Sequence, residues 1–257
     1  MKDPKAPIGV FDSGVGGLTV LKALRHALPR EDFLYFGDTA RVPYGGKPLP
    51  MVRRFAWEIA GFLLRQGVKA LVVACNTASS AALPDLAEDL SVPVFGVLEP
   101  AAEVARGYRK VGLIGTQATV ESGAYGRYVP LAWAKACPLF VPLVEEGLWD
   151  DPVALLVARH YLEEAPKDLE ALILGCTHYP FLKGTLEKVL PGVKLIDSAE
   201  ATARKVAEAL RQAGLLNPEG QGKVVHYVTG DPESYKALAE RLGERVETLY
   251  RVSLEEL

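Results

Sequence analysis

The sequence contains two near-copies of one ten-residue pattern. "LVVACNTASS" occupies residues 71–80, and "LILGCTHYPF" occupies residues 172–181. Each is an apolar run that ends in a cysteine and continues with polar residues. Two of the three cysteines in the chain, Cys75 and Cys176, therefore share one context. Such self-similarity over a long period indicates a fold built from two related halves.

The segments that precede and follow the cysteines repeat as well. "IGVFDS" resembles "VGLIGT", which aligns Ser13 with Thr116. Cys75 then lies 62 residues after Ser13 (75 − 13), and Cys176 lies 60 residues after Thr116 (176 − 116). In both halves the next strand-like run begins 17 residues after the cysteine (92 − 75 and 193 − 176). Units of about 100 residues suit two lobes rather than a solenoid.

Apolar runs bounded by turn residues alternate with segments of helical periodicity, which predicts an α/β fold with mainly parallel sheets. We expect two pseudosymmetric lobes, each a mainly parallel sheet flanked by helices, with the active site in the cleft between them. Residues 98–209 are assigned to the second lobe. The first lobe takes residues 1–97 and 210–257, because the C-terminal tail has no counterpart after the first unit and would return to complete it.

Composition and charge argue against several classes of function. The net charge is -3 and no basic block occurs, so neither nucleic acid nor an anionic membrane is expected as a partner. No apolar stretch approaches the length of a membrane span, and the N-terminus lacks a signal-peptide pattern, so a cytoplasmic protein is expected. The odd cysteine count argues against a disulfide framework, and the absence of paired Cys/His spacing argues against a metal site.

Cys75 and Cys176 both fall where a predicted strand ends. In parallel α/β sheets, ligands bind outside the carboxyl ends of the strands. If the two lobes face each other, the two thiols meet across one cleft. The alternative for each is a small buried hydrophobic side chain, which is the interpretation we give to Cys137. The polar residues that follow Cys75 and Cys176 favour a site instead.

Two thiols on opposite walls of a cleft suit a proton transfer that inverts a tetrahedral carbon. One thiol removes a proton, and the other delivers a proton to the opposite face. A free thiol has a pKa of about 8.5, and one thiolate raises the pKa of its neighbour by like-charge repulsion. The pair then holds one base and one acid. Asp12, at the end of the first strand, and His178, two residues after Cys176, are the candidates that manage these protons.

Four segments together resemble a known family. "GVFDSGVGG", "GDTARVPYG", "VVACNTAS" and "LILGCTHYPFL" are similar, in this order, to the signature segments of the glutamate racemases. The resemblance covers nearly the whole chain. It implies the two-lobed fold of the cofactor-independent Asp/Glu racemase group, and the interconversion of L- and D-glutamate, which supplies D-glutamate for peptidoglycan. Glutamate is then the expected small-molecule partner, and no cofactor and no metal are expected. Members of the family often form dimers, so a homodimer is an open expectation.

The resemblance also implies roles for individual residues. Cys75 is implied to be the base toward D-glutamate, and Cys176 the base toward L-glutamate, each serving as the acid in the other direction. Asp12 is implied to assist Cys75 and to contact the substrate ammonium, and His178 is implied to assist Cys176. Glu145 is implied to be a third assisting acid.

The choice between Glu145 and its neighbour Glu146 stays open in the sequence. The remaining implied contacts with substrate share hydroxyl, amide or backbone donors that can hold carboxylates in fixed positions. They are Ser13, Tyr44, Gly45, Asn76, Thr77, Thr119 and Thr177, together with Asp12 and His178.

Other functions are compatible with the same residues. An aspartate racemase would keep the mechanism and change the substrate. A cysteine hydrolase or lyase would need one nucleophile, and an amino-acid binding module would bind without exchanging the α-proton. Since no pyridoxal site is evident, racemisation would need lobes that close and exclude water. We therefore expect hinges at residues 97–100 and 206–214.

Overall fold

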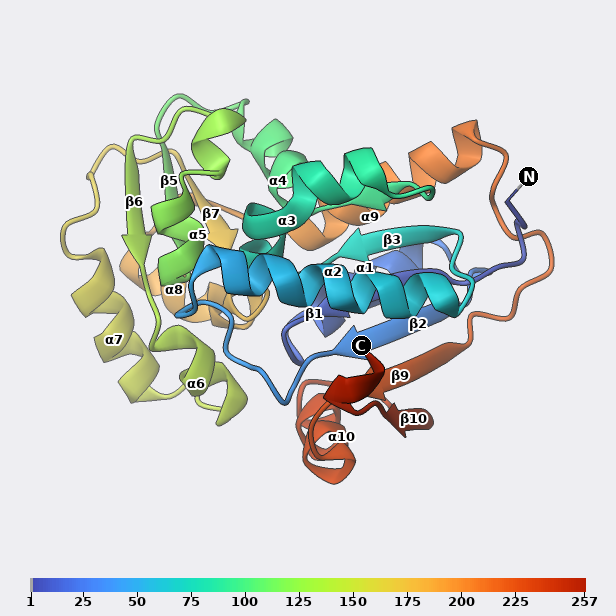
Figure 1. Ribbon diagram of the computed structural model, residues 1–257. Coiled ribbons are helices and arrows are strands. Elements are labelled where there is room, and N and C mark those ends of the chain that lie inside the picture. Colours follow the sequence, from blue (N-terminus) through green and yellow to red (C-terminus); the bar gives the residue numbers. More distant parts are fainter. Residues whose placement is uncertain (1) are drawn as a thin grey trace.

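The computed structural model describes residues 2–257, in which two sheets of parallel strands are flanked by helices (Figure 1). The first sheet has the strand order β10-β9-β2-β1-β3-β4 and the second the order β6-β5-β7-β8. In the first sheet the strands are β1 (Ile8–Asp12), β2 (Phe33–Gly37), β3 (Ala70–Val73), β4 (Val94–Phe95), β9 (Val224–Val228) and β10 (Thr248–Arg251). In the second they are β5 (Val111–Gly115), β6 (Trp133–Ala136), β7 (Ala171–Gly175) and β8 (Lys194–Ile196).

Helices occupy most of the segments between the strands. The α-helices are α1 (Leu18–Ala27), α2 (Leu49–Arg65), α3 (Asn76–Asp89), α4 (Leu98–Ala105), α5 (Gln117–Ser122), α6 (Phe140–Glu145), α7 (Pro152–Leu162), α8 (Lys183–Val189), α9 (Ser198–Gln212) and α10 (Pro232–Arg241). Three short 3-10 helices are η1 (Tyr125–Arg127), η2 (Tyr179–Leu182) and η3 (Leu254–Glu256).

The strand order confirms the internal repeat. Within the first sheet the order β2-β1-β3-β4 corresponds, strand by strand, to β6-β5-β7-β8 of the second sheet. The cysteine of each half follows the equivalent strand, β3 or β7. The C-terminal strands β9 and β10 extend the first sheet, because β9 pairs with β2. The expected division into residues 1–97 plus 210–257 and residues 98–209 stays a prediction.

The central strands read as continuous apolar runs because both of their faces are covered. Every residue of β1, β3, β5 and β7 is buried. Parallel strands of α/β folds show this pattern because crossover helices lie on both sides of the sheet. Helix α2 ends just before Gly67, which adopts the left-handed conformation (φ 83°) that stops a helix at little steric cost.

One hydrophobic core runs through both halves of the molecule. It joins side chains of β1 and α1 to side chains of β5, β7 and α9, among them Ile8, Leu21, Val111, Ile173 and Val206. Helix α9 packs against both α1 and α4. The two sheets are therefore held in one arrangement by shared apolar packing on the side of α1, α4 and α9.

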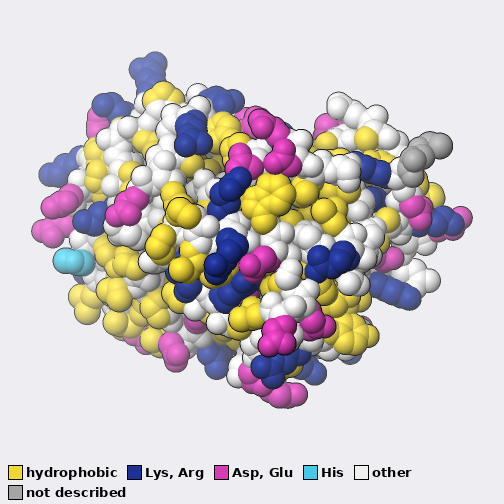
Figure 2. Space-filling model, viewed as in Figure 1, with side chains coloured by type: hydrophobic (Ala, Val, Ile, Leu, Met, Phe, Trp, Pro, Cys, Tyr) yellow, Lys and Arg dark blue, Asp and Glu magenta, His cyan; other side chains and the backbone are white. Residues whose placement is uncertain are grey.

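The surface shown in Figure 2 mixes positive, negative and hydrophobic side chains, in keeping with a net charge of -3. Among the helices of residues 2–257, none combines the length and the apolar character that crossing a membrane requires.

Candidate active site

The two cysteines of the repeat lie against one small cavity. Cys75 follows β3 and caps the N-terminus of α3, and Cys176 follows β7 directly. Both side chains are buried, and both line a cavity of ≈ 30 Å³ at the carboxyl ends of the two sets of strands. The expected meeting of the two strand ends is therefore present in the structure.

Most of the predicted contact residues surround this cavity. From the first half it is lined by Ser13, Val42, Pro43, Tyr44, Gly45, Cys75, Asn76 and Thr77, and from the second half by Thr116, Val141, Cys176, Thr177 and His178. Sequence reasoning missed Val42, Pro43, Thr116 and Val141. The signal for Thr116 was available, because the internal alignment pairs it with Ser13.

Thr119 does not reach the cavity. Its side chain is fully buried, and its hydroxyl contacts those of Thr116 (3.0 Å) and Thr77 (3.4 Å). The structure therefore places Thr119 behind the two threonines that line the site. The expected direct contact of Thr119 with substrate stays a prediction.

Cys75 lies in surroundings that favour the neutral thiol. Its Sγ accepts a hydrogen bond from the backbone N–H of Ala78 at 3.4 Å. Burial raises the pKa of the Cys75 thiol well above its ordinary value, and the nearby Asp12 carboxylate raises it further, while the Ala78 N–H opposes both effects. These surroundings therefore favour the protonated form of Cys75.

Asp12 is fully buried beside Cys75 and does not line the cavity itself. Its Oδ2 accepts hydrogen bonds from the backbone N–H groups of Gly14 (3.1 Å) and Gly17 (3.0 Å). Its Oδ1 has no hydrogen-bond partner within residues 2–257. A buried carboxylate oxygen without a partner is costly, so this atom is available to accept a hydrogen bond.

Cys176 has a different set of neighbours. His178 Nδ1 lies 3.8 Å from Cys176 Sγ, and His178 Nε2 lies 2.9 Å from Glu145 Oε1. Burial lowers the pKa of His178, but the Cys176 sulfur and the Glu145 carboxylate raise it more, to about 10. His178 is therefore cationic near neutral pH and donates from both nitrogens. Of the two adjacent glutamates, the structure places Glu145 against His178.

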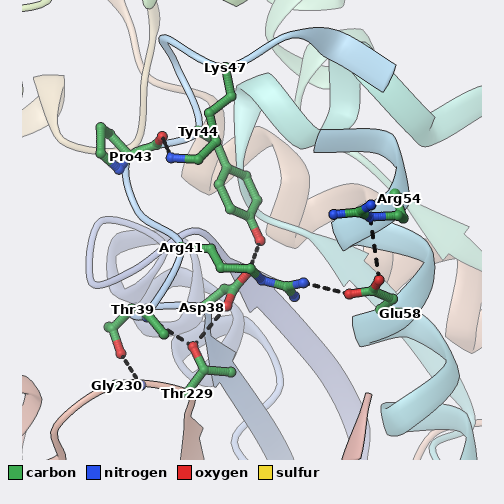
Figure 3. Close-up of polar contacts among 11 residues, drawn as sticks. Asp38, Thr39, Arg41, Pro43, Tyr44, Lys47, Arg54, Glu58, Thr229 and Gly230 are labelled. Carbon is green, nitrogen blue, oxygen red and sulfur yellow. Dashed lines mark hydrogen bonds and ion pairs between the residues drawn. The ribbon is translucent and has the colours of Figure 1, made fainter. Parts of the chain in front are cut away.

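The loop that carries Tyr44 and Gly45 is held by a buried carboxylate (Figure 3). Asp38 Oδ2 accepts hydrogen bonds from the Tyr44 hydroxyl and from Arg41 Nε (2.8 Å), and Asp38 Oδ1 accepts one from Thr229 (2.8 Å). The Tyr44 hydroxyl thus points to Asp38, and burial together with this carboxylate raises its pKa. These hydrogen bonds therefore hold in place the loop that lines the cavity with Tyr44 and Gly45.

Hydrogen bonds cross between the two halves around the cavity. The Ala118 N–H donates to the Gly45 carbonyl oxygen (2.9 Å), and the hydroxyls of Thr77 and Thr116 are 2.8 Å apart. These contacts close the site and set the spacing of its two walls.

A larger groove of ≈ 960 Å³ lies elsewhere, between α1 and α9. None of the three cysteines lines it, so its size does not make it the site of the thiol chemistry. Within the described part of the chain, no three His, Cys, Asp or Glu side chains are grouped to hold a metal ion.

Comparison with known proteins agrees with this geometry. Residues 8–206 match the Asp/Glu/Hydantoin racemase family. The chain belongs to this family of racemases. Within it, the chain is 87% identical over 257 residues to a glutamate racemase of Thermus thermophilus, with 100% of both chains covered.

Solved structures agree as well. A glutamate racemase from Thermus thermophilus, crystallised in complex with β-chloro-D-alanine, superposes with a TM-score of 0.98 at 86% identity, covering 100% of both chains. A glutamate racemase from Francisella tularensis, in complex with D-glutamate, superposes with a TM-score of 0.93 at 38% identity, covering 99% of this chain and 100% of that one.

Proposed function

We propose that the chain interconverts L- and D-glutamate by proton transfer at the α-carbon, without a cofactor. The observation that carries the proposal is the placement of Cys75 and Cys176 at equivalent strand ends on one shared cavity. A carbon held between them would lose its proton to one thiolate and receive a proton from the other thiol. The product is the opposite enantiomer.

The two cysteines have unlike polar neighbours. Cys75 is held as the neutral thiol by burial and by Asp12. Cationic His178 beside Cys176 stabilises negative charge on that sulfur. Toward L-glutamate, Cys176 beside His178 would act as the base and Cys75 as the acid. Toward D-glutamate the two roles would be exchanged.

The polar residues of the cavity suit a small amino acid with two carboxylates. Ser13, Thr77 and Thr177 bring hydroxyl groups, and Asn76 brings an amide. Such donors hold carboxylates and stabilise negative charge that develops in a transition state. The unpartnered Oδ1 of Asp12 would receive the substrate ammonium or its proton. Glu145 would hold His178 in the cationic form that assists Cys176.

Substrate entry would require the halves to separate. A cavity of ≈ 30 Å³ holds roughly two water molecules, which is less than a glutamate requires. A closed form with a cavity of this size would exclude water during proton transfer. Hinges at residues 97–100 and 206–214 would open it. X-ray scattering with and without D-glutamate tests this, since equal profiles would contradict it.

The reaction would supply D-glutamate for peptidoglycan in the cytoplasm. A homodimer is proposed only because members of the family often form dimers. Sedimentation equilibrium of the purified chain measures its mass, and a monomer at all concentrations would exclude it.

Proton NMR in heavy water tests the reaction directly. The purified chain is incubated with L-glutamate or D-glutamate without a cofactor, and circular dichroism follows the optical rotation. We expect both enantiomers to exchange the α-proton and to converge on the racemate. If neither exchanges, the proposed reaction is wrong, and aspartate becomes the next substrate to test.

Single cysteine variants test the two-thiol mechanism. Cys75→Ser and Cys176→Ser should each abolish racemisation, because inversion needs an acid and a base together. The two losses should be of similar size. A loss confined to one variant would instead indicate a single nucleophile, as in a hydrolase or lyase.

A further inference from the structure

Tyr125 of η1 reaches across from the second half of the molecule to the first. Its hydroxyl donates a hydrogen bond to Oδ1 of Asn76, the first residue of α3. Both residues are almost fully buried, and Asn76 lines the cavity between the cysteines. Tyr125 itself does not line the cavity, so any effect it has on substrate passes through Asn76.

The hydrogen bond fixes which way the Asn76 amide faces. Burial raises the pKa of Tyr125 far above its ordinary value, and the nearby Cys176 raises it further, so the phenol keeps its proton and needs an acceptor. Oδ1 of Asn76 supplies that acceptor. The Nδ2 group of the same amide then has no partner within residues 2–257, although it is buried. An unpartnered buried donor on a residue that lines the cavity is the atom a ligand would satisfy.

We propose that Tyr125 is a positioning residue, which holds the Asn76 amide with Nδ2 presented to a substrate carboxylate. The inference rests on the proposed function, because it takes an amino-acid carboxylate as the ligand. A flipped amide would present Oδ1 to the carboxylate and repel it. Since Tyr125 and Asn76 lie on opposite halves, this orientation is fixed only when the halves are closed.

The ring of Tyr125 has a separate packing role, which the test must leave intact. It belongs to the core shared by both halves, and its Cε2 lies 3.5 Å from where a Cβ on Gly175 would stand. Tyr125→Phe keeps this ring and removes only the hydroxyl. Without this hydroxyl, the Asn76 amide would no longer be held in one orientation by a hydrogen bond from Tyr125.

The test is the steady-state kinetics of Tyr125→Phe with both enantiomers of glutamate. Losing an oriented hydrogen bond to a carboxylate should raise KM about ten-fold, while kcat changes less than about two-fold, because the bond holds substrate and transition state alike. A matched control is Tyr161→Phe, which removes the hydroxyl that accepts from the Leu139 N–H at 3.0 Å, away from the cavity. Tyr161→Phe should leave KM unchanged.

A double-variant cycle separates positioning from general stabilisation. In an Asn76→Ala background, Tyr125→Phe should have no further effect on KM, because the amide that it orients is gone. An unchanged KM in the single variant, a fall in kcat alone, or additive effects in the double variant would each overturn the inference. Failure of the unmodified chain to racemise glutamate would instead overturn the proposed function.

Discussion

His226 of β9 makes the stability of the fold depend on pH in a way that can be worked out from its surroundings. The side chain is buried, its Nδ1 lies 2.9 Å from the hydroxyl of Tyr235, and its Nε2 has no partner within residues 2–257. Burial lowers the pKa of His226, and the charge of Arg25 lowers it further, to about 4. The folded protein therefore keeps this imidazole neutral where an unfolded chain would protonate it.

The sign and size of the effect follow from linkage. An unfolded histidine has a pKa of about 6.5, so between this value and about 4 the unfolded state binds more protons than the folded state. The free energy of unfolding therefore falls as the pH falls below about 6.5, and the loss levels off near pH 4. At about 1.36 kcal/mol per pKa unit, the full loss is about 3 kcal/mol.

The variant His226→Phe keeps a ring of similar size and cannot titrate. It also loses the bond to Tyr235, which adds an offset that does not change with pH. Guanidinium unfolding from about pH 7.5 to about pH 4.5 gives the free energy of both proteins. Relative to the parent, His226→Phe should gain about 2.5 kcal/mol over this range. His160→Phe, at an exposed position on α7, controls for the loss of an imidazole and should follow the parent.

A difference between His226→Phe and the parent that stays constant with pH would refute the reasoning. It would mean that the imidazole is already charged in the fold, or that water reaches it. Fluorescence and circular dichroism should give coincident transitions at each pH, because the linkage treatment assumes two states.

Two further predictions concern close packing and a buried ion pair. A Cβ on Gly16 would lie 2.6 Å from His178 Nδ1, so Gly16→Ala should displace the second half and lower kcat/KM at least about ten-fold. The control is Gly46→Ala, where a Cβ would have nothing within 4 Å, so this variant should leave kcat/KM unchanged. Equal kcat/KM values for the two variants would contradict this reasoning. Lys69 is buried, and its Nζ lies 2.5 Å from Oε2 of Glu31. Lys69→Met leaves the Glu31 carboxylate buried without its partner, so the free energy of unfolding by guanidinium should fall by about 3–5 kcal/mol. The double variant Lys69→Met with Glu31→Gln removes that charge and should lose less. A double variant no more stable than the single one would show that the unpaired carboxylate is not the cause.

The positions of the cysteines could be predicted because they depend on chain-local patterns. A buried apolar run ending in a polar residue marks a strand end, and the repeat places two such ends in equivalent strands. The alternation of strands and helices predicted mainly parallel sheets, but it did not predict the order of the strands within them. The strand ends and the alternation could be predicted because each of them is set within a single βα unit.

Other parts of the site depend on packing between units, and sequence patterns do not carry them. Glu145 and Glu146 are adjacent at the end of the six-residue helix α6, and which of them meets His178 depends on how that helix rests on the sheet. Val141 reaches the cavity from the same helix. The contact of Tyr125 with Asn76 joins residues 49 positions apart in the chain and belongs to no motif.

The repeat is symmetric in its cysteines and asymmetric in the groups beside them. Asp12 ends β1, and the aligned position at the end of β5 is Gly115. A Cβ at Gly115 would lie 3.3 Å from a backbone carbonyl oxygen and 3.4 Å from Thr119, so the second half has little room for a matching aspartate.

The second half places its assisting group elsewhere. His178 follows its cysteine by two residues, where the first half has Thr77. The Asp12 carboxylate raises the pKa of the Cys75 thiol, whereas the imidazole of His178 lies beside Cys176. The two cysteines therefore occupy equivalent strand ends, while the polar groups that surround them depart from the symmetry of the repeat.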